Sequence, residues 1–288
     1  MLKPIIFAMF LLSHCWAFAA TEQVSFPGAR GEGYPFTEEV TGKLQVPDNA
    51  KAPMAAVVVL HGSGGIDGRG AFHAEALNKA GIATLEVFMF AGGQRFKGGH
   101  TTTLTHAYGA LKYLAGRADI DPKKIGVMGF SWGGNVSLRT ASKAVHRKFF
   151  PEGAPMFAAH APYYAVWWSH LQVLKDPAAS GHGDYADMTG APVFLFAGGK
   201  DDYGAPDAGQ QFLDALPNEA RKHVSLQFYP DATHGWDSPG NRQRTIYDPV
   251  AHDGKGGQVR FFPDRAIAED SRDKTVTFFL KSFGMTPQ

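Results

Sequence analysis

The chain has 288 residues, of which 44% are hydrophobic and 19% are charged, and its formal net charge is +1. These proportions are typical of a globular protein, and they exclude a disordered or fibrous chain. The basic residues are scattered, so the sequence lacks the charge pattern of a nucleic-acid-binding protein or of one held on an anionic membrane, and we expect a small-molecule partner.

The amino-terminal residues have the three-part pattern of a secretory signal peptide. Positively charged Lys3 is followed by the apolar run Pro4–Leu12 and by small residues that end in Ala19 and Ala20. The apolar run is shorter than the roughly 20 residues that a membrane-spanning helix needs. We therefore expect cleavage after Ala19 or Ala20, no stable membrane insertion afterwards, and an exported protein that is periplasmic or secreted.

Cys15 offers an alternative interpretation of this segment as a lipid-attachment site, but the bulky His14 before the cysteine argues against it. Cleavage would remove Lys3 and Cys15, which leaves equal numbers of basic and acidic residues and no cysteine. Disulfides and cysteine chemistry are thereby excluded from the mature chain.

From Thr41 onward, short β-rich runs alternate with longer amphipathic segments. The expected strands are Val57–Leu60, Ile82–Phe90, Ile125–Met128, Met156–Ala159, Val193–Phe196 and Val224–Tyr229. The expected helices are Glu75–Ala80, Thr102–Leu114, Gly134–Ala144, Ala208–Leu216 and Ala266–Phe283. This alternation predicts an α/β protein with a mostly parallel central sheet flanked by helices on both faces.

We predict two parts of the chain, a signal peptide in residues 1–20 and a single domain in residues 21–288. Residues 241–262 are rich in Arg, Asp and Gly, break the alternation, and are expected to form a surface excursion. In a parallel sheet the functional loops follow the carboxyl ends of the strands, so the catalytic residues are expected at those positions.

The sequence Gly-Phe-Ser-Trp-Gly follows the expected strand Ile125–Met128 and precedes a helix that begins near Gly134. It matches the nucleophile-elbow pattern Gly-x-Ser-x-Gly in its strand-turn-helix context, with Ser131 as the nucleophile. Gly129 and Gly133 are required because the turn is too tight for side chains there. The hydroxyl of Ser131 would lie at the amino end of a helix, which favours developing negative charge.

A second glycine-rich loop, residues 61–65, directly follows the strand Val57–Leu60. In the α/β-hydrolase fold this loop supplies one donor of the oxyanion hole, and the residue after the nucleophile supplies the other. We therefore expect the backbone N–H groups of Ser63 and Trp132 to bind the oxyanion, with Gly64 as the alternative to Ser63.

Two neighbouring aspartates, Asp201 and Asp202, follow the strand Val193–Phe196. The segment resembles the acid loop of α/β hydrolases, Gly-x-x-Asp with a proline four residues later, which here is Pro206. That register favours Asp202 as the catalytic acid, and it leaves Asp201 as the rival or as a solvated turn residue.

His234 follows the last expected strand, Val224–Tyr229. A single histidine is more often a packing or surface residue than a catalyst, but this one lies beyond the aspartates and completes the chain order Ser, Asp, His that the fold requires. We expect His234 to take the proton of Ser131 while Asp202 fixes the tautomer of the imidazole.

With these residues in place, the chain resembles the dienelactone hydrolase family of α/β hydrolases over residues 55–283. The resemblance rests on the acid loop and on three motifs, His61-Gly62-Ser63-Gly64-Gly65, Gly129-Phe130-Ser131-Trp132-Gly133-Gly134 and His234-Gly235-Trp236. It implies hydrolysis of carboxylic esters or lactones without a cofactor, in a compact sheet with little or no lid. No metal site is expected, because the spacing of His160, His170, His182 and Asp184 fits no compact zinc motif. Dienelactone hydrolases proper use a cysteine nucleophile, so Ser131 favours general esterase activity over the narrow dienelactone activity.

The function predicted from the sequence is thus that of an exported serine hydrolase that acts through an acyl-enzyme. Two alternatives use the same fold, a peptidase or amidase with the same triad and a non-catalytic protein that binds small molecules. The aromatic residues between His160 and His170 either line a substrate pocket or pack in the core. The natural substrate and the oligomeric state stay open.

Overall fold

The computed structural model describes residues 20–36, 39–48, 50–90, 99–180, 184–240 and 242–286. Apart from Ala20, the expected signal peptide lies outside the described residues. No helix in the described ranges is both long and apolar enough to cross a membrane.

An eight-stranded sheet with the strand order β1-β2-β4-β3-β5-β6-β7-β8 forms the centre of the protein. Its strands are β1 (Ala20–Phe26), β2 (Val40–Val46), β3 (Met54–Leu60), β4 (Ala83–Phe88), β5 (Ile120–Phe130), β6 (Ala159–Tyr163), β7 (Val193–Gly198) and β8 (Val224–Tyr229). β1 and β2 run antiparallel to their neighbours, whereas the pairings from β4 through β3, β5, β6 and β7 to β8 are parallel. The predicted mostly parallel sheet is confirmed.

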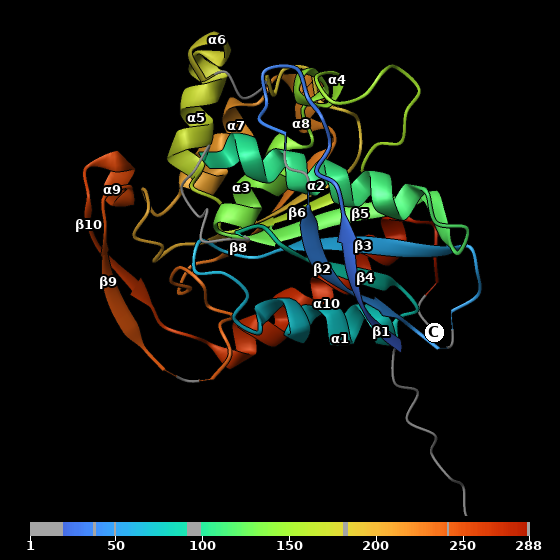
Figure 1. Cartoon of the computed structure of the whole chain (residues 1–288). Coiled ribbons are helices and arrows are strands. Elements are labelled where there is room, and N and C mark those ends of the chain that lie inside the picture. Colours follow the sequence, from blue (N-terminus) through green and yellow to red (C-terminus); the bar gives the residue numbers. More distant parts are fainter. Residues whose placement is uncertain are drawn as a thin grey trace, which may run out of the picture.

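Helices cover both faces of this sheet (Figure 1). The helices are α1 (Arg69–Lys79), α2 (Gly99–Ala115), α3 (Trp132–Arg139), α4 (Lys143–Arg147), α5 (Trp167–Lys175), α6 (Pro177–Ser180), α7 (Ala208–Ala215), α8 (Asn218–Arg221), α9 (Ala251–Gly254) and α10 (Arg265–Ser282). In Figure 1, α1 and α10 lie below the sheet, and α2, α3, α5 and α7 lie above it. Because helices cover it on both sides, every residue of the central strand β3 is buried.

The amino-terminal strands are an addition that the hydrophobic pattern did not predict. β2 pairs with β4, and β1 forms the outer edge of the sheet. Polar and apolar residues alternate along β2, so that Val40, Gly42 and Leu44 are turned to the interior. A single covered face of this kind is typical of an antiparallel strand at the margin of a sheet.

β6 lies further along the chain than the expected strand at Met156–Ala159. Its ladder with β5 begins where Ala159 pairs with Gly126, and it continues to Tyr163. His160 and Pro162 interrupt the apolar pattern of this strand, yet all five of its residues are buried. Burial lowers the pKa of His160 to about 4, so the ring stays neutral, and one nitrogen lies 3.1 Å from the Ser137 carbonyl oxygen.

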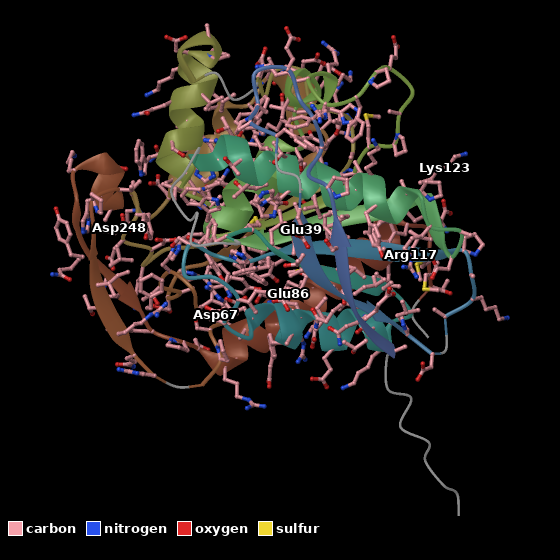
Figure 2. The ribbon with its side chains drawn as sticks, in the orientation of Figure 1. Glu39, Asp67, Glu86, Arg117, Lys123 and Asp248 are labelled. Atoms are coloured by element: carbon pink, nitrogen blue, oxygen red, sulfur yellow. The ribbon has the colours of Figure 1, made fainter. Side chains whose placement is uncertain are left out.

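Within the expected surface excursion at residues 241–262, the described residues 242–262 contain a hairpin outside the main sheet (Figure 1). It consists of the antiparallel strands β9 (Arg244–Asp248) and β10 (Gly257–Phe261), with α9 between them. Figure 2 shows Asp248 on this hairpin, which stands beside the body of the protein. Its inner side packs in a small apolar cluster with the residue directly before α5 and one from the loop after β7. The cluster is made of Val166, Tyr203, Ala251, Val259 and Phe261.

Candidate active site

Ser131 stands at a strained turn between β5 and α3. Its backbone φ is 53° and ψ is −107°, a conformation that costs free energy in a residue other than glycine and is concentrated at functional sites. The Ser131 N–H donates to the Tyr163 carbonyl at 3.0 Å, and its carbonyl accepts from the Asn135 N–H at 2.9 Å. The turn is thereby fixed by β6 on one side and by α3 on the other.

Close backbone contacts explain the two glycines that flank this turn. A Cβ on Gly129 would lie 2.4 Å from the backbone of Gly133, and one on Gly133 would lie 2.2 Å from the Leu60 carbonyl oxygen. No neighbouring side chain could move to relieve either contact, because the obstructing atoms belong to the backbone. The requirement for glycine at both positions, expected from the sequence, is confirmed.

The side chain of Trp132 is held by the beginning of α2. Its ring stacks on His100 with the centroids 3.9 Å apart, and its indole N–H donates to the Thr103 hydroxyl at 3.1 Å. Trp132 is also the first residue of α3, so its backbone N–H belongs to the helix end next to Ser131. This location fits the expected oxyanion donor.

Residues 61–65 form a tight turn in which the Gly65 N–H donates to the Gly62 carbonyl at 3.0 Å. His61 fixes the beginning of the turn. Its Nε2 accepts from the Met89 N–H at 2.9 Å, so Nδ1 carries the proton and donates to the Gly62 carbonyl at 2.8 Å. Burial lowers the pKa of His61 and keeps this tautomer neutral. Ser63 lies within the held turn, and the choice between Ser63 and Gly64 as oxyanion donor stays a prediction.

His234 and Asp201 form the histidine–carboxylate pair of the site. The Nδ1 of His234 lies 2.8 Å from Oδ2 of Asp201, and both side chains are buried. The other carboxylate oxygen, Oδ1, accepts from the Tyr203 N–H at 3.1 Å. Because both carboxylate oxygens are engaged, the orientation of Asp201 toward the imidazole is fixed.

Asp202 makes no hydrogen bond to His234, contrary to the expectation that Asp202 orients the base, and Asp201 takes that place in the structure. Its carboxylate accepts three hydrogen bonds from Arg260 of β10, from the backbone N–H, Nε and one terminal nitrogen, at 2.6–2.8 Å. Consecutive residues of the turn face opposite sides, and Asp202 faces the hairpin. Burial opposes ionisation of Asp202, but the Arg260 guanidinium outweighs it and lowers the pKa of this carboxyl.

Three aromatic rings enclose the imidazole of His234. The ring centroids of Tyr203, Tyr164 and Phe261 lie 4.4, 4.9 and 5.3 Å from that of His234. Tyr164 also stacks against Phe130, the residue before the serine, at 6.4 Å. The base and the nucleophile turn are therefore adjacent, and the three rings pack around the imidazole.

Nε2 of His234 has no hydrogen-bond partner within the described ranges. It is therefore not bonded to the hydroxyl of Ser131 in this conformation. Hydrogen bonds between catalytic groups are often long or poorly aligned in proteins without substrate, and they tighten when substrate binds. The structure thus brings Asp201 and His234 into contact, whereas Ser131 and His234 are not joined by a hydrogen bond in this conformation.

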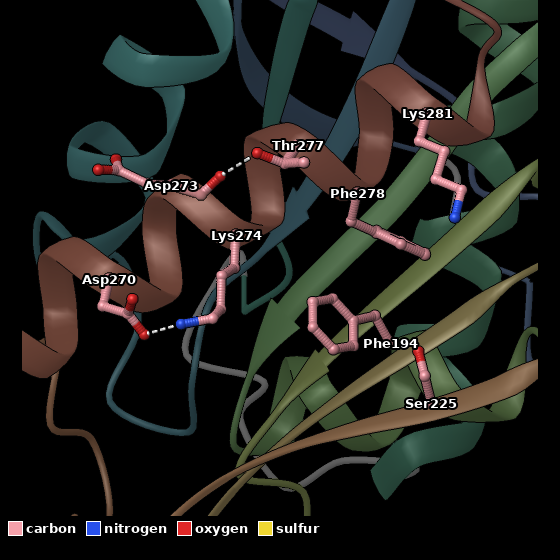
Figure 3. Close-up of a pocket in the computed structure, with 8 residues that line it drawn as sticks. All are labelled: Phe194, Ser225, Asp270, Asp273, Lys274, Thr277, Phe278 and Lys281. Carbon is pink, nitrogen blue, oxygen red and sulfur yellow. Dashed lines mark hydrogen bonds and ion pairs between the residues drawn. The ribbon is translucent and has the colours of Figure 1, made fainter.

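The groove in Figure 3 lies elsewhere, between α10 and the strands β7 and β8. It has a volume of about 490 Å³ and is lined by Phe194, Ser225, Asp270, Asp273, Lys274, Thr277, Phe278 and Lys281. None of these residues belongs to the site around Ser131, and the acidic and basic side chains balance one another. Within the ranges described, no cluster of three or more His, Cys, Asp or Glu residues is placed to hold a metal ion.

The order of these residues along the chain, serine, then aspartate, then histidine, and their loops at the carboxyl ends of β5, β7 and β8 are those of an α/β hydrolase. This fold class confirms the expectation from the sequence.

The chain belongs to the dienelactone hydrolase family, whose family model matches residues 40–282. The resemblance drawn from the sequence motifs is confirmed, and the matched region reaches further toward the amino terminus than the expected residues 55–283. As a member of this family, the chain is a hydrolase of the ester-cleaving type. No curated protein matches the chain.

Solved structures of this fold include a putative dienelactone hydrolase from Klebsiella pneumoniae, with a TM-score of 0.62 and 16% identity over 91% of this chain and 99% of that one. Esterase 2 of Thermogutta terrifontis, phosphorylated by paraoxon, has a TM-score of 0.64 and 15% identity over 92% of this chain and 96% of that one. A dienelactone hydrolase-like promiscuous phosphotriesterase from metagenomic libraries has a TM-score of 0.54 and 17% identity over 92% and 100%. At these identities the likeness concerns the fold.

Proposed function

We propose that the protein is an exported serine hydrolase that cleaves carboxylic esters or lactones with Ser131 as nucleophile, His234 as base and Asp201 as the residue that orients the base. The observation that carries the proposal is the 2.8 Å contact between His234 Nδ1 and Asp201 Oδ2 on the loops that flank the strained serine turn. A histidine with its Nδ1–H bound to a carboxylate presents an unprotonated Nε2, which is the atom a serine base needs.

In the proposed reaction, His234 Nε2 takes the hydroxyl proton as Ser131 attacks the substrate carbonyl. The imidazolium that forms is stabilised by the Asp201 carboxylate. His234 then gives the proton to the leaving alcohol, and the acyl group stays on Ser131. A water molecule, deprotonated by the same histidine, hydrolyses the acyl-enzyme and restores the serine.

The tetrahedral intermediate carries a negative oxygen, and the proposed donors for it are the backbone N–H groups of Trp132 and Ser63. Both donors belong to segments that are fixed by other contacts. Trp132 is held through its ring by α2, and the turn after β3 is held by His61. Fixed donors are effective because they need no reorganisation when charge develops.

Hydrolysis of p-nitrophenyl esters of increasing acyl length tests the proposed activity. We expect the mature protein to release p-nitrophenolate and to show an optimum chain length, because the volume beside Ser131 limits the acyl group. A fluorescent serine-directed phosphonate should label the protein in parallel, and peptide mass spectrometry should place the label on Ser131. Labelling without ester turnover would favour the amidase alternative, and the absence of both would favour the non-catalytic binding protein.

Export is tested by the amino terminus of the protein in its native host. We expect the mature chain in the periplasmic or culture fraction to begin at Ala20 or Thr21, because the small residues before these positions fit signal peptidase cleavage. Retention of Met1 in a cytoplasmic fraction would contradict export. A lipid-modified Cys15 at the amino terminus would identify the alternative attachment site instead.

A further inference from the structure

A buried arginine lies beneath the candidate active site and has no role in the proposed proton transfers. Arg69, the first residue of α1, is 4% exposed. Its Nε and one terminal nitrogen donate to the carboxylate of Asp67 at 2.7–3.1 Å, and its other terminal nitrogen donates to the Tyr164 hydroxyl at 3.0 Å. Figure 2 shows Asp67 at the entrance to α1. The guanidinium therefore has a fixed plane and a fixed position.

The hydroxyl of Tyr164 links Arg69 to the loop that contains His234. It donates to Oδ1 of Asp237 at 2.5 Å while it accepts from Arg69. Burial raises the pKa of Tyr164, so the hydroxyl keeps its proton. The backbone φ of Tyr164 is 34°, a strained value for a residue with a side chain. The strained backbone of Tyr164 therefore lies at the residue whose ring packs against His234.

Asp237 is a fully enclosed carboxylate only three residues beyond His234. Its second oxygen, Oδ2, lies 2.9 Å from Nε2 of His73 on α1, and neither side chain is more than 1% exposed. Burial alone would raise the pKa of Asp237, but the hydrogen bond from His73 and the charge of Arg69 lower it below its ordinary value. The carboxylate is therefore ionised and bound on both of its oxygens.

These four residues, Arg69, Tyr164, Asp237 and His73, are called the charged brace below. The brace contacts the segments that must be aligned for acyl transfer. Nη2 of Arg69 lies 2.9 Å from the position that a Cβ on Gly62 would take, in the oxyanion turn, and Nη1 lies 3.6 Å from the corresponding position on Gly235, next to His234. One guanidinium thus hydrogen-bonds the loop after β6 and lies next to the turn after β3 and the loop after β8.

We propose that the charged brace positions the His234 loop relative to the oxyanion turn, with Tyr164 as the central positioning residue. The proposal rests on the proposed function for its catalytic consequence, although the alignment itself is a property of the fold. A displacement of about 1 Å between a base and its nucleophile can lower the rate of reaction about 100-fold. Ionic hydrogen bonds in a dry interior resist such a displacement better than apolar contacts, because they have direction.

The decisive variant is Tyr164→Phe, because it removes the bridging hydroxyl but keeps the ring against His234. Replacing Arg69 or Asp237 would instead leave an unpaired buried charge and endanger folding. We expect Tyr164→Phe to lower kcat about 10- to 100-fold with KM changed less than about twofold, since substrate contacts are kept while the base is misaligned. We also expect hydrogen–deuterium exchange at residues 230–238 to become about tenfold faster.

Tyr185→Phe is the matched control. Tyr185 is also fully buried, and its hydroxyl lies 2.6 Å from Nδ1 of His170 and hydrogen-bonds Arg139. It therefore links a histidine and an arginine as Tyr164 does, but it belongs to the cluster packed on α7 and makes no contact with His234 among the described residues. The loss of one buried hydroxyl should lower the melting temperature of both variants, while kcat and exchange at residues 230–238 change only in Tyr164→Phe.

Three outcomes decide the proposal. Faster exchange at residues 230–238 together with a lower kcat, in Tyr164→Phe alone, supports it. If hydrogen–deuterium exchange at residues 230–238, or kcat, is the same in Tyr164→Phe as in Tyr185→Phe, the positioning role is overturned. If the unmodified protein hydrolyses no ester, the proposed function fails, but exchange at residues 230–238 still decides whether the brace holds the loop.

Discussion

Replacing Ser131 by alanine is expected to lower kcat for ester hydrolysis on the order of 10⁴-fold or more while the protein stays folded. The side chain of Ser131 supplies the nucleophile, and no acyl-enzyme forms without it. The activity that remains would come from the oxyanion donors and from substrate binding, which act without the triad. The measurement is the initial rate with the best p-nitrophenyl ester, for purified proteins whose melting temperatures have been compared.

Ser137→Ala is the control for this result. Ser137 lies in α3, the helix that follows Ser131, and is fully buried, and its hydroxyl donates to the Val127 carbonyl at 3.2 Å. Its loss should cost about 1 kcal/mol of stability and leave the rate per folded molecule within about twofold, because a distant buried hydroxyl makes no contact with substrate. If Ser131→Ala kept the activity of the unmodified protein, Ser131 would not be the nucleophile.

Asp201 and Asp202 should respond very differently to replacement by asparagine. We expect Asp201→Asn to lower kcat about 10³- to 10⁴-fold, because an amide that presents its NH₂ group to Nδ1 holds His234 in the wrong tautomer. The carboxamide is almost the same size as the carboxylate, so packing around the buried pair is kept. Rates measured across the ester series give the effect on kcat separately from that on KM.

Asp202→Asn is expected to change kcat by less than about tenfold, since its carboxylate lies on the hairpin side of the turn, away from the base. The variant weakens a half-exposed ion pair with Arg260, which is worth at most about 1 kcal/mol. A large loss of kcat in Asp202→Asn with little change in Asp201→Asn would reverse the assignment and restore the register inferred from sequence.

Local signals in the sequence were sufficient for most of the parallel strands and for two of the three residues of the proposed triad. Gly129 is needed because of a contact with Gly133 inside the same strand-turn-helix unit, whereas Gly133 is needed because the neighbouring strand β3 lies against it, and the motif could be recognised because both glycines stand at fixed positions around Ser131. His234 could be selected because the fold orders its catalytic loops along the chain. The strands β3, β5 and β7 contain apolar runs, and β8 alternates apolar and polar residues, so all four could be recognised without knowledge of their neighbours.

The failures arose where distant residues determine local structure. The choice between Asp201 and Asp202 depends on Arg260, which is 58 residues from Asp202 in the sequence and forms hydrogen bonds and an ion pair with its carboxylate. β6 was misplaced because a buried histidine and a proline interrupt its apolar pattern, and only covering on both faces makes that segment a strand. The charged brace also left no local signal, because its members come from α1, the loop after β6 and the loop after β8.

The contacts of the brace span long stretches of chain, and this has a consequence for folding. Arg69 and Tyr164 are 95 residues apart, and His73 and Asp237 are 164 residues apart. Non-local contacts form slowly, because the entropy of closing large loops must be overcome before the contacts stabilise the chain. The parallel strands must assemble before the hydrogen bonds of the charged brace can form, so the loop that contains His234 reaches its final position late in folding. During refolding, catalytic activity would therefore return later than helical structure. The enzymatic rate would report the last step of folding and not the initial collapse of the chain.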